Sequence, residues 1–115
     1  MTVDTPTPME RQHAETLLVI GQALFALAKL PDTPDAIALF LASHGVKGEP
    51  CGSADDALAV WLRRFVPCAV RSFQDRVELE GGRWSFTLYH PSHVRRFVVG
   101  FDAGEWPYLH ADDAR

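Results

Sequence analysis

Six side chains in the middle and last parts of the chain are of types that ligate zinc or act as nucleophiles. They are His44, Cys51, Cys68, His90, His93 and His110. A structural zinc site needs ligands at short, regular spacings, such as Cys-x-x-Cys followed by a spaced pair of histidines. The chain has no Cys-x-x-Cys, and His90 and His93 straddle the expected start of a helix. We therefore expect no metal ligand among them and interpret these histidines as residues that flank helix ends.

Nucleophilic catalysis and phosphate binding have equally little support. A reactive cysteine needs neighbours that lower its pKa, and nothing in the sequence ties Cys51 or Cys68 to such neighbours. Gly81-Gly82 lies between two strand-like segments, whereas a phosphate-binding loop leads into a helix. The sequence thus predicts no catalytic residue and no cofactor, and an enzyme is the least expected class.

The two cysteines flank a helix expected at residues 53–66, which would span about 20 Å. Bridged cysteines need Cα atoms within about 7 Å of each other, so Cys51 and Cys68 are not expected to pair. A chain of 115 residues can fold as one domain without metals or disulfides. We expect a single cytoplasmic domain, with residues 1–7 and 110–115 as flexible tails.

The elements that position these side chains include a helix predicted at residues 33–44. Asp32 or Thr33 can cap its free N–H groups, and Pro34 suits the first helical position. Its apolar residues recur at helical spacing, and Gly45 supplies the left-handed residue that ends the helix.

A second helix is predicted at residues 53–66, with Ser53 as its N-cap and Asp56 at the position of the capping-box acid. Pro67 ends it. Its apolar stripe consists of Leu58, Trp61, Leu62 and Phe65. Because Trp61 lies in the middle of this stripe, we expect its side chain to be buried.

The helix expected before this pair runs from Pro8 to about Leu30, is capped by Thr7 and contains the apolar segment LLVIGQALFALA. The face expected to contact the core comprises Leu17, Ile20, Leu24, Leu27 and Ala28, widened by Ala14, Leu18 and Phe25. Glu10 and Glu15 argue against a signal peptide, and the apolar run is too short to span a bilayer. We expect a core helix and no membrane contact.

After Pro67 the pattern changes to the alternation typical of strands. A short strand is expected near residues 69–73, followed by a hairpin that turns at Gly81-Gly82 with positive φ angles. This turn would pair Glu80 with Arg83 and Leu79 with Trp84. The apolar face, which must cover the helices, consists of Val77, Leu79, Trp84, Phe86 and Leu88.

A last helix is predicted at residues 91–103 and ends at Gly104, with a buried stripe formed by Val94, Phe97, Val98 and Phe101. The sequence therefore predicts an α+β domain. It contains three N-terminal helices, an antiparallel β-hairpin with a possible third strand, and a C-terminal helix. This order is compatible with a winged-helix-like layout.

Three segments, IALFLASHGVKGEP, WLRRF and VRRFVVGFDAGEWPYL, resemble a group of small proteins of actinobacteria and their phages. In that group a helix, a Gly-x-Lys-Gly turn and a second helix precede a hairpin. A terminal helix then ends in a Phe-Asp-x-Gly-Glu-x-Pro-like segment. The resemblance covers residues 33–109 and implies a compact cytoplasmic domain. It implies no activity and no site residues.

DNA binding by a winged helix is one alternative function. The arginines that would contact phosphates are Arg63, Arg64, Arg76, Arg83, Arg95 and Arg96. The net charge of −4 disfavours nucleic acid as a partner. Asp55 and Asp56 would also stand at the start of the recognition helix, where Arg, Asn or Gln usually contact DNA.

Protein binding is the function we expect first, as a regulatory or accessory module whose partner is another protein or a second copy. Trp106, Tyr108, Arg95 and Arg96 are of the types enriched at interface centres. For Trp106 the alternative is that it closes the end of the core.

Overall fold

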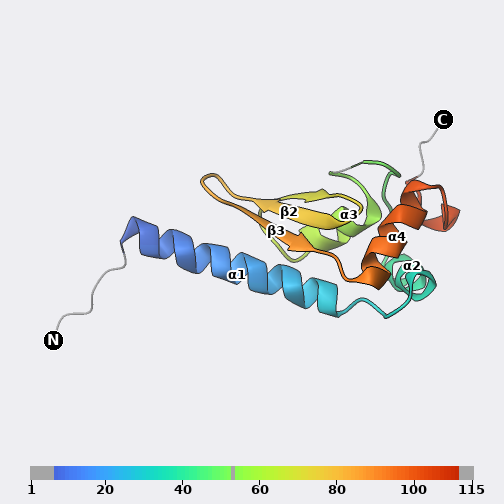
Figure 1. Cartoon of the computed structure of the whole chain (residues 1–115), viewed down its shortest axis with the longest axis horizontal. Helices are drawn as coiled ribbons and strands as arrows, with labels where there is room; N and C mark the ends of the chain where they lie inside the picture. The colour runs from blue at the N-terminus through green and yellow to red at the C-terminus, as the bar shows by residue number, and fades with distance from the viewer. Residues whose placement is uncertain (1–6, 53, 112–115) are drawn as a thin grey trace.

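The structure, a computed structural model, describes residues 7–52 and 54–111, apart from the side chains of Met9 and Gln12. In chain order the elements are α1 (Pro8–Ala28), α2 (Pro34–Ser43), α3 (Ala57–Arg63), β1 (Ala69–Ser72), β2 (Arg76–Glu80), β3 (Ser85–Tyr89), α4 (Ser92–Asp102) and the 3-10 helix η1 (Pro107–Leu109). The strands form one antiparallel sheet in the order β1-β2-β3. Figure 1 shows α1 along one side of this sheet and α2 and α4 together at one end. The predicted α+β class, including the third strand, is confirmed.

Helix α1 begins at the residue that the sequence predicts. The Thr7 hydroxyl accepts a hydrogen bond from the Glu10 N–H (3.1 Å), and the Glu10 carboxylate accepts one from the Thr7 N–H (3.4 Å). This reciprocal pair is a complete capping box, with Pro8 in the first helical position.

The face of α1 that contacts the rest of the domain is not the one predicted. Its buried residues are Val19, Ala23 and Ala26, and Leu30 continues the same stripe just after the helix. The predicted core residues Leu17, Leu18, Leu24 and Phe25 are instead exposed. The physical reason is close approach, since small side chains let α1 lie against α3 at a distance that leucines would prevent.

Helix α2 follows the prediction. The Thr33 hydroxyl accepts from the Ala36 N–H (3.2 Å), and Pro34 occupies the first position. Gly45 has a φ of 71°, and the Val46 N–H bonds back to the Leu41 carbonyl (3.0 Å), which closes the helix end.

Helix α3 is shorter than predicted. Its expected N-cap is Ser53, whereas the helix begins at Ala57. Ser53 lies outside the described residues, and Asp56 is the N-cap, accepting from the Ala59 N–H at 2.7 Å. A separate turn precedes this cap, in which the Asp56 N–H bonds to the Gly52 carbonyl (2.8 Å). Asp56 therefore caps the helix instead of serving as the acid of a capping box.

The sheet has the predicted alternation but a different register, and Phe86, predicted to face the helices, is exposed (38%). Glu80 pairs with Ser85 and Leu79 with Phe86, so each β2 residue meets a β3 residue two positions later than expected. The Gly81 N–H bonds to the Trp84 carbonyl (2.9 Å), which places the tip at Gly82 and Arg83. Neither glycine has a positive φ. The Trp84 ring lies over Gly81 and leaves no room for a Cβ there, which accounts for the shifted turn.

The C-terminal part packs on α2. The predicted stripe of α4 is buried in full: Val94, Phe97, Val98 and Phe101. After Gly104, with a φ of 94°, the chain returns along the link between α2 and α3, where Gly48 bonds to Leu109 and Ala111 (2.9 and 2.8 Å). His110 forms an isolated bridge with Gly48. His110 and Ala111, expected in the tail, are thus paired with the body of the domain, whereas residues 1–6 and 112–115 lie outside the described part.

The helix arrangement departs from a helix–turn–helix pair. Helix α2 packs mainly on α4, and α3 packs on β1 and α1. The link between α2 and α3, residues 44–56, exceeds the three or four residues typical of the motif. Contact between α2 and α3 passes through aromatic rings, with Phe40 5.2 Å from Trp61 between centroids.

We expect Trp61→Ala to lower the free energy of unfolding by about 3–5 kcal/mol, because the ring is 3% exposed and its indole N–H donates to the Ala26 carbonyl (3.0 Å). Urea denaturation measures this change. Leu39→Ala is the matched control, since Leu39 is 64% exposed, and should change stability by less than about 1 kcal/mol. A loss at Trp61 no larger than at Leu39 would contradict its place in the core.

Candidate interaction surface

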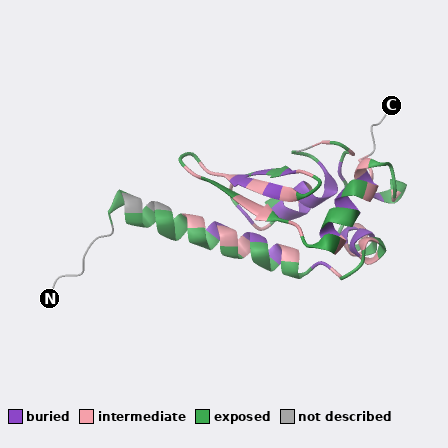
Figure 2. Cartoon of the chain, in the orientation of Figure 1, coloured by how far each residue is buried: buried purple, intermediate pink, exposed green. Residues whose placement is uncertain are grey.

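The outward side of α1 carries a continuous row of exposed apolar side chains. We call it the outer face and define it as Ala14, Leu17, Leu18, Gly21, Leu24, Phe25 and Ala28. At 3.6 residues per turn these positions fall within an arc of about 120°, opposite the buried stripe. The four large members are 68%, 63%, 51% and 58% exposed, in chain order. Figure 2 shows this exposure along the outer side of the helix.

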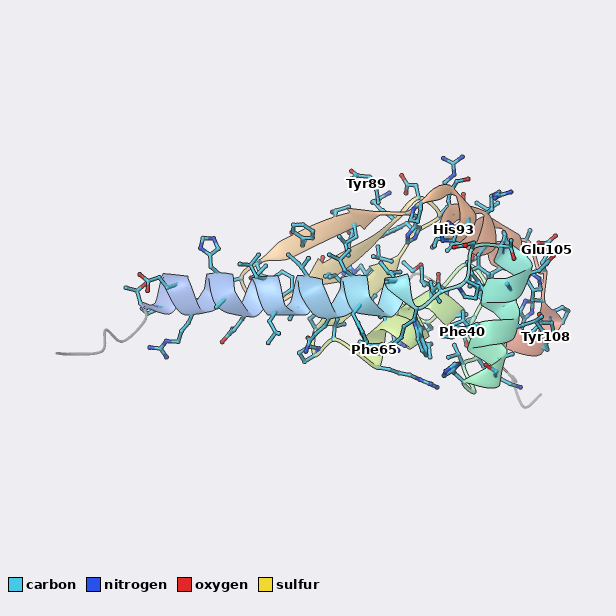
Figure 3. The ribbon with its side chains drawn as sticks, turned by 90° about the horizontal axis from the view of Figure 1, so that it is seen from below. Phe40, Phe65, Tyr89, His93, Glu105 and Tyr108 are labelled. Atoms are coloured by element: carbon cyan, nitrogen blue, oxygen red, sulfur yellow. The ribbon has the colours of Figure 1, made fainter. Side chains whose placement is uncertain are left out.

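Shallow grooves border the outer face on both sides. On one side a groove passes between α1 and the residues that follow α3, and its walls include Leu18, Phe25 and Phe65. On the other side a groove between α1 and the end of β3 includes Leu24, Ala28 and Tyr89. Figure 3 shows Phe65 and Tyr89 on opposite sides of α1. The helix is therefore a ridge with an apolar groove on each flank, a shape that admits a second helix.

The predicted C-terminal site divides into two parts. The Trp106 ring stacks on Phe97 (centroids 5.1 Å apart), and its indole N–H donates to the Asp35 carboxylate at 2.9 Å. Its ring also leaves no room for a Cβ at Gly100. Trp106 has a left-handed φ of 54°, a strained conformation that these contacts maintain. Tyr108, by contrast, is 46% exposed.

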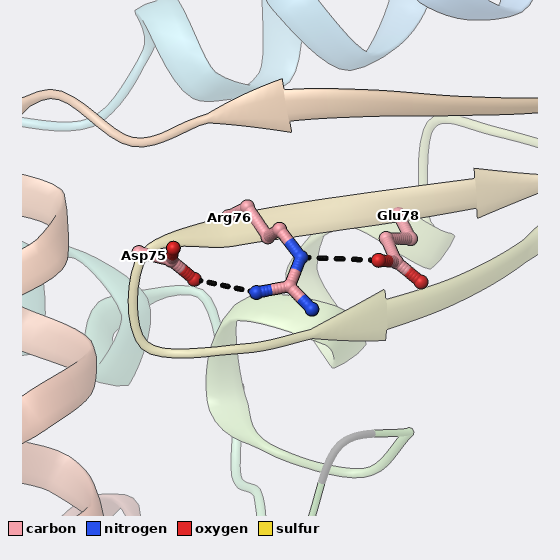
Figure 4. Close-up of polar contacts among 3 residues, drawn as sticks. All are labelled: Asp75, Arg76 and Glu78. Carbon is pink, nitrogen blue, oxygen red and sulfur yellow. Dashed lines mark hydrogen bonds and ion pairs between the residues drawn. The ribbon is translucent and has the colours of Figure 1, made fainter.

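The arginines predicted to contact DNA mostly bond to acceptors of their own chain. Arg76 donates to Asp75 (2.8 Å) and Glu78 (3.0 Å), as Figure 4 shows. Arg63 pairs with Asp55 (3.5 Å) and donates to the Ala54 carbonyl. These ion pairs hold the guanidinium groups on the protein surface and reduce the charge available to a phosphate.

The remaining predicted arginines are placed differently. Arg64 donates to the His44 carbonyl at 2.8 Å and lies 5.9 Å from the Trp61 ring. Arg83 stands at the tip of the hairpin, whereas Arg95 and Arg96 are exposed on α4. The predicted set is thus spread over α3, the sheet and α4, and DNA binding stays a prediction.

The buried Asp56 and the half-buried His90 have shifted pKa values. Burial raises the pKa of Asp56 to about 6, against the opposing effects of Ser72 and of the hydrogen bond from Ala59. Burial also lowers the pKa of His90 to about 4. General acid–base catalysis requires a group within reach of a bound substrate, whereas the Asp56 carboxylate is covered and caps α3. We interpret Asp56 as structural.

The cysteines and the other metal-binding types do not converge in the part of the chain that the structure describes. Cys51 is exposed and Cys68 half-buried, and both thiols are free. The Cys51 N–H donates to the Asp102 carboxylate (2.9 Å), which anchors the loop after α2 to α4. Within residues 7–52 and 54–111, no three His, Cys, Asp or Glu side chains are placed to hold a metal ion.

Fold and surface together define a small α+β domain with an apolar helix face turned to solvent. Comparison of the chain with protein-family models, curated protein sequences and solved structures gives no match. Among the described helices, none combines the length and apolarity that crossing a membrane requires. The candidate site therefore rests on the geometry of the domain itself.

Sequence reasoning placed the outer face in the core and so missed it as a site. The sequence signal that marks it is the spacing of its members, which lie three, four or seven residues from Gly21 on either side. A second signal is the stripe of small residues, Ala23 and Ala26, on the other side. Two apolar stripes on one helix indicate two packing partners.

The C-terminal geometry predicts that Trp106 and Tyr108 behave differently when replaced. Trp106→Ala removes a stacked ring and an indole hydrogen bond, so we expect a loss of about 2 kcal/mol and a melting temperature lower by several degrees. Tyr108→Ala should change stability by less than about 0.5 kcal/mol. Thermal denaturation of the two single variants measures the difference, and equal losses would contradict this division.

The burial of Asp56 predicts how stability depends on pH. The native carboxyl holds its proton up to about pH 6, whereas in the unfolded chain it ionises near pH 3.8, so its ionisation destabilises the fold as the pH rises through that window. Asparagine caps helices well and does not titrate. Between pH 4 and 7, the stability of the wild type relative to Asp56→Asn should therefore fall by about 3 kcal/mol. Urea denaturation across this range measures it, and parallel pH profiles for the two proteins would contradict it.

Proposed function

We propose that this protein is a non-enzymatic binding module that docks another polypeptide on the outer face of α1. The observation that carries the proposal is the exposure of four large apolar side chains, Leu17, Leu18, Leu24 and Phe25, in one continuous stripe. Contiguous exposed apolar surface of this kind is uncommon on monomers and marks binding sites.

The buried core of the domain contains none of these four side chains. Val19, Ala23 and Ala26 are the residues of α1 within that core, and Leu27 packs against it. Phe25 also makes an edge contact with Phe65, with ring centroids 6.2 Å apart. The apolar area that stays exposed has an unfavourable interaction with water, which a partner would remove. Helix α1 forms a ridge with an apolar groove on each flank, and this shape suits an α-helical partner segment.

We infer that the protein has an accessory or regulatory role in the cytoplasm. Both cysteines are free although Cys51 is exposed, which fits a reducing compartment. The partners that the outer face can accept carry an apolar helical stripe of their own, whereas the net charge of −4 disfavours nucleic acid.

Site-specific photocrosslinking in living cells tests the docking surface. A benzophenone side chain in place of Phe25, which is 58% exposed, should form a discrete adduct whose polypeptide is identified by mass spectrometry. The same group in place of Leu39, an equally exposed residue of α2, is the matched control and should form none. Absence of an adduct at position 25, or equal adducts at both positions, would overturn the proposal.

A further inference from the structure

The outer face is symmetric in residue size about its central residue, Gly21. Moving away from Gly21 in either direction, a leucine comes at three residues, a large apolar residue at four and an alanine at seven. The three pairs are Leu18 and Leu24, Leu17 and Phe25, and Ala14 and Ala28. In an antiparallel contact centred on Gly21, such a pattern places residues of similar size opposite each other.

A two-fold dimer brings one patch into contact with the same patch on the partner. When two α1 helices lie antiparallel with the axis at Gly21, every residue meets the partner residue equally far on the other side. Leu18 then meets the partner's Leu24, and Leu17 meets the partner's Phe25. Large residues meet large ones, and alanine meets alanine.

Packing within the described part of the chain does not require a glycine at position 21. A Cβ added there would meet no atom within 4 Å, so the domain has space for a larger residue. Glycine within a helix lowers helix propensity, and its lack of a side chain lets another backbone approach closely. At the axis of an antiparallel pair Gly21 meets Gly21, where the two helices are nearest.

The body of the domain packs against the side of α1 that lies opposite the outer face. The buried stripe of α1 lies opposite the outer face, so the two domain bodies would extend away from the shared helix pair. Figure 3, seen from the α1 side, shows the helix in front of the remaining ribbon.

The helix dipoles favour the antiparallel direction over the parallel one, because each helix N-terminus then lies beside the C-terminus of the partner helix. A parallel pair would instead place Glu10 beside Glu10 and Lys29 beside Lys29.

The area available indicates the strength of such a dimer. A leucine or phenylalanine side chain presents on the order of 150–200 Å², and the four large members are between 51% and 68% exposed. They therefore offer roughly 400 Å² per copy, or roughly 800 Å² in all, and the groove walls add to this. The four side chains alone fall short of the roughly 1,000 Å² that a biological interface usually exceeds, so the dimer is weak and its formation depends on concentration.

We propose that the outer face binds a second copy of this chain, forming an antiparallel two-fold dimer centred on Gly21. This inference rests on the proposed docking function and names its occupant. The dimer forms and dissociates with concentration, so it offers a way to regulate access to the outer face.

Sedimentation equilibrium of the full chain from about 1 to 200 µM tests the inference with a pair of charge variants. Wild type should be dimeric at the upper end of this range. Leu18→Glu and Leu24→Lys should each weaken dimerisation at least tenfold when alone, because each places a charge against the partner's leucine. An equimolar mixture should restore dimers, since the carboxylate introduced at position 18 of one copy then faces the ammonium group introduced at position 24 of the other, and the remaining leucines meet. Unchanged melting curves check that each variant folds.

The outcomes separate this inference from the function on which it rests. A wild type that stays monomeric at 200 µM, or a mixture of variants that does not restore dimers, would overturn the antiparallel dimer. If the Phe25 photocrosslink then identifies a different protein, the docking function stands and its partner is not a second copy. If neither charge variant weakened dimerisation, the outer face would not be the dimer contact.

Discussion

The contacts of Trp61 are the constraint on which the rest of the structure depends. Its indole N–H donates to the Ala26 carbonyl, which joins α3 to α1. Its ring lies within 5.2 Å of the rings of Phe40, His44 and Phe65, so it also joins α3 to α2. A buried indole needs a partner for its N–H, and the Ala26 carbonyl is available because it lies in the last turn of α1, where the Leu30 N–H donates to the Leu27 carbonyl instead.

That one contact determines which side of α1 faces the core. Burying Leu17, Leu18, Leu24 and Phe25 instead would move the helix axis outward and leave the indole N–H without its acceptor. Hydrophobic periodicity gives more weight to large residues and therefore predicted the wrong face, although it identified the helix and its cap correctly. The choice between two apolar stripes depends on tertiary contacts, and no local pattern contains them.

Local signals were sufficient wherever the neighbours along the chain decide the structure. The Thr7 cap, a cap at Asp32 or Thr33, the left-handed Gly45, the helix stop at Gly104 and the buried stripe of α4 were all predicted, because each depends on residues within one or two turns. The α+β class followed from the change of period after Pro67. The hairpin register and the start of α3 were not predicted correctly, because the packing of Trp84 over Gly81 and the burial of Asp56 decide them.

The same distinction explains why the outer face was missed and the C-terminal site was predicted only in part. Residue type suggested Trp106 and Tyr108 as an interface, but type does not show that Trp106 stacks on Phe97 and bonds to Asp35, some seventy residues earlier in the chain. Tyr108 keeps an exposed position, and its role in binding stays a prediction.

The division of α1 into two faces has a consequence for how binding and folding are linked. The domain uses small residues, whose packing depends on close approach, whereas the outer face uses large residues, whose contribution depends on the area removed from water. If the outer face docks a partner as proposed, a change from leucine to a polar residue there alters docking with little effect on the core. A larger residue in place of Ala23 or Ala26 would instead separate α1 from α3 and break the indole contact, with loss of stability. In the proposed docking, binding strength and fold stability thus depend largely on separate residues of one helix, and Gly21 belongs to the proposed binding set because its own chain leaves the space above it empty.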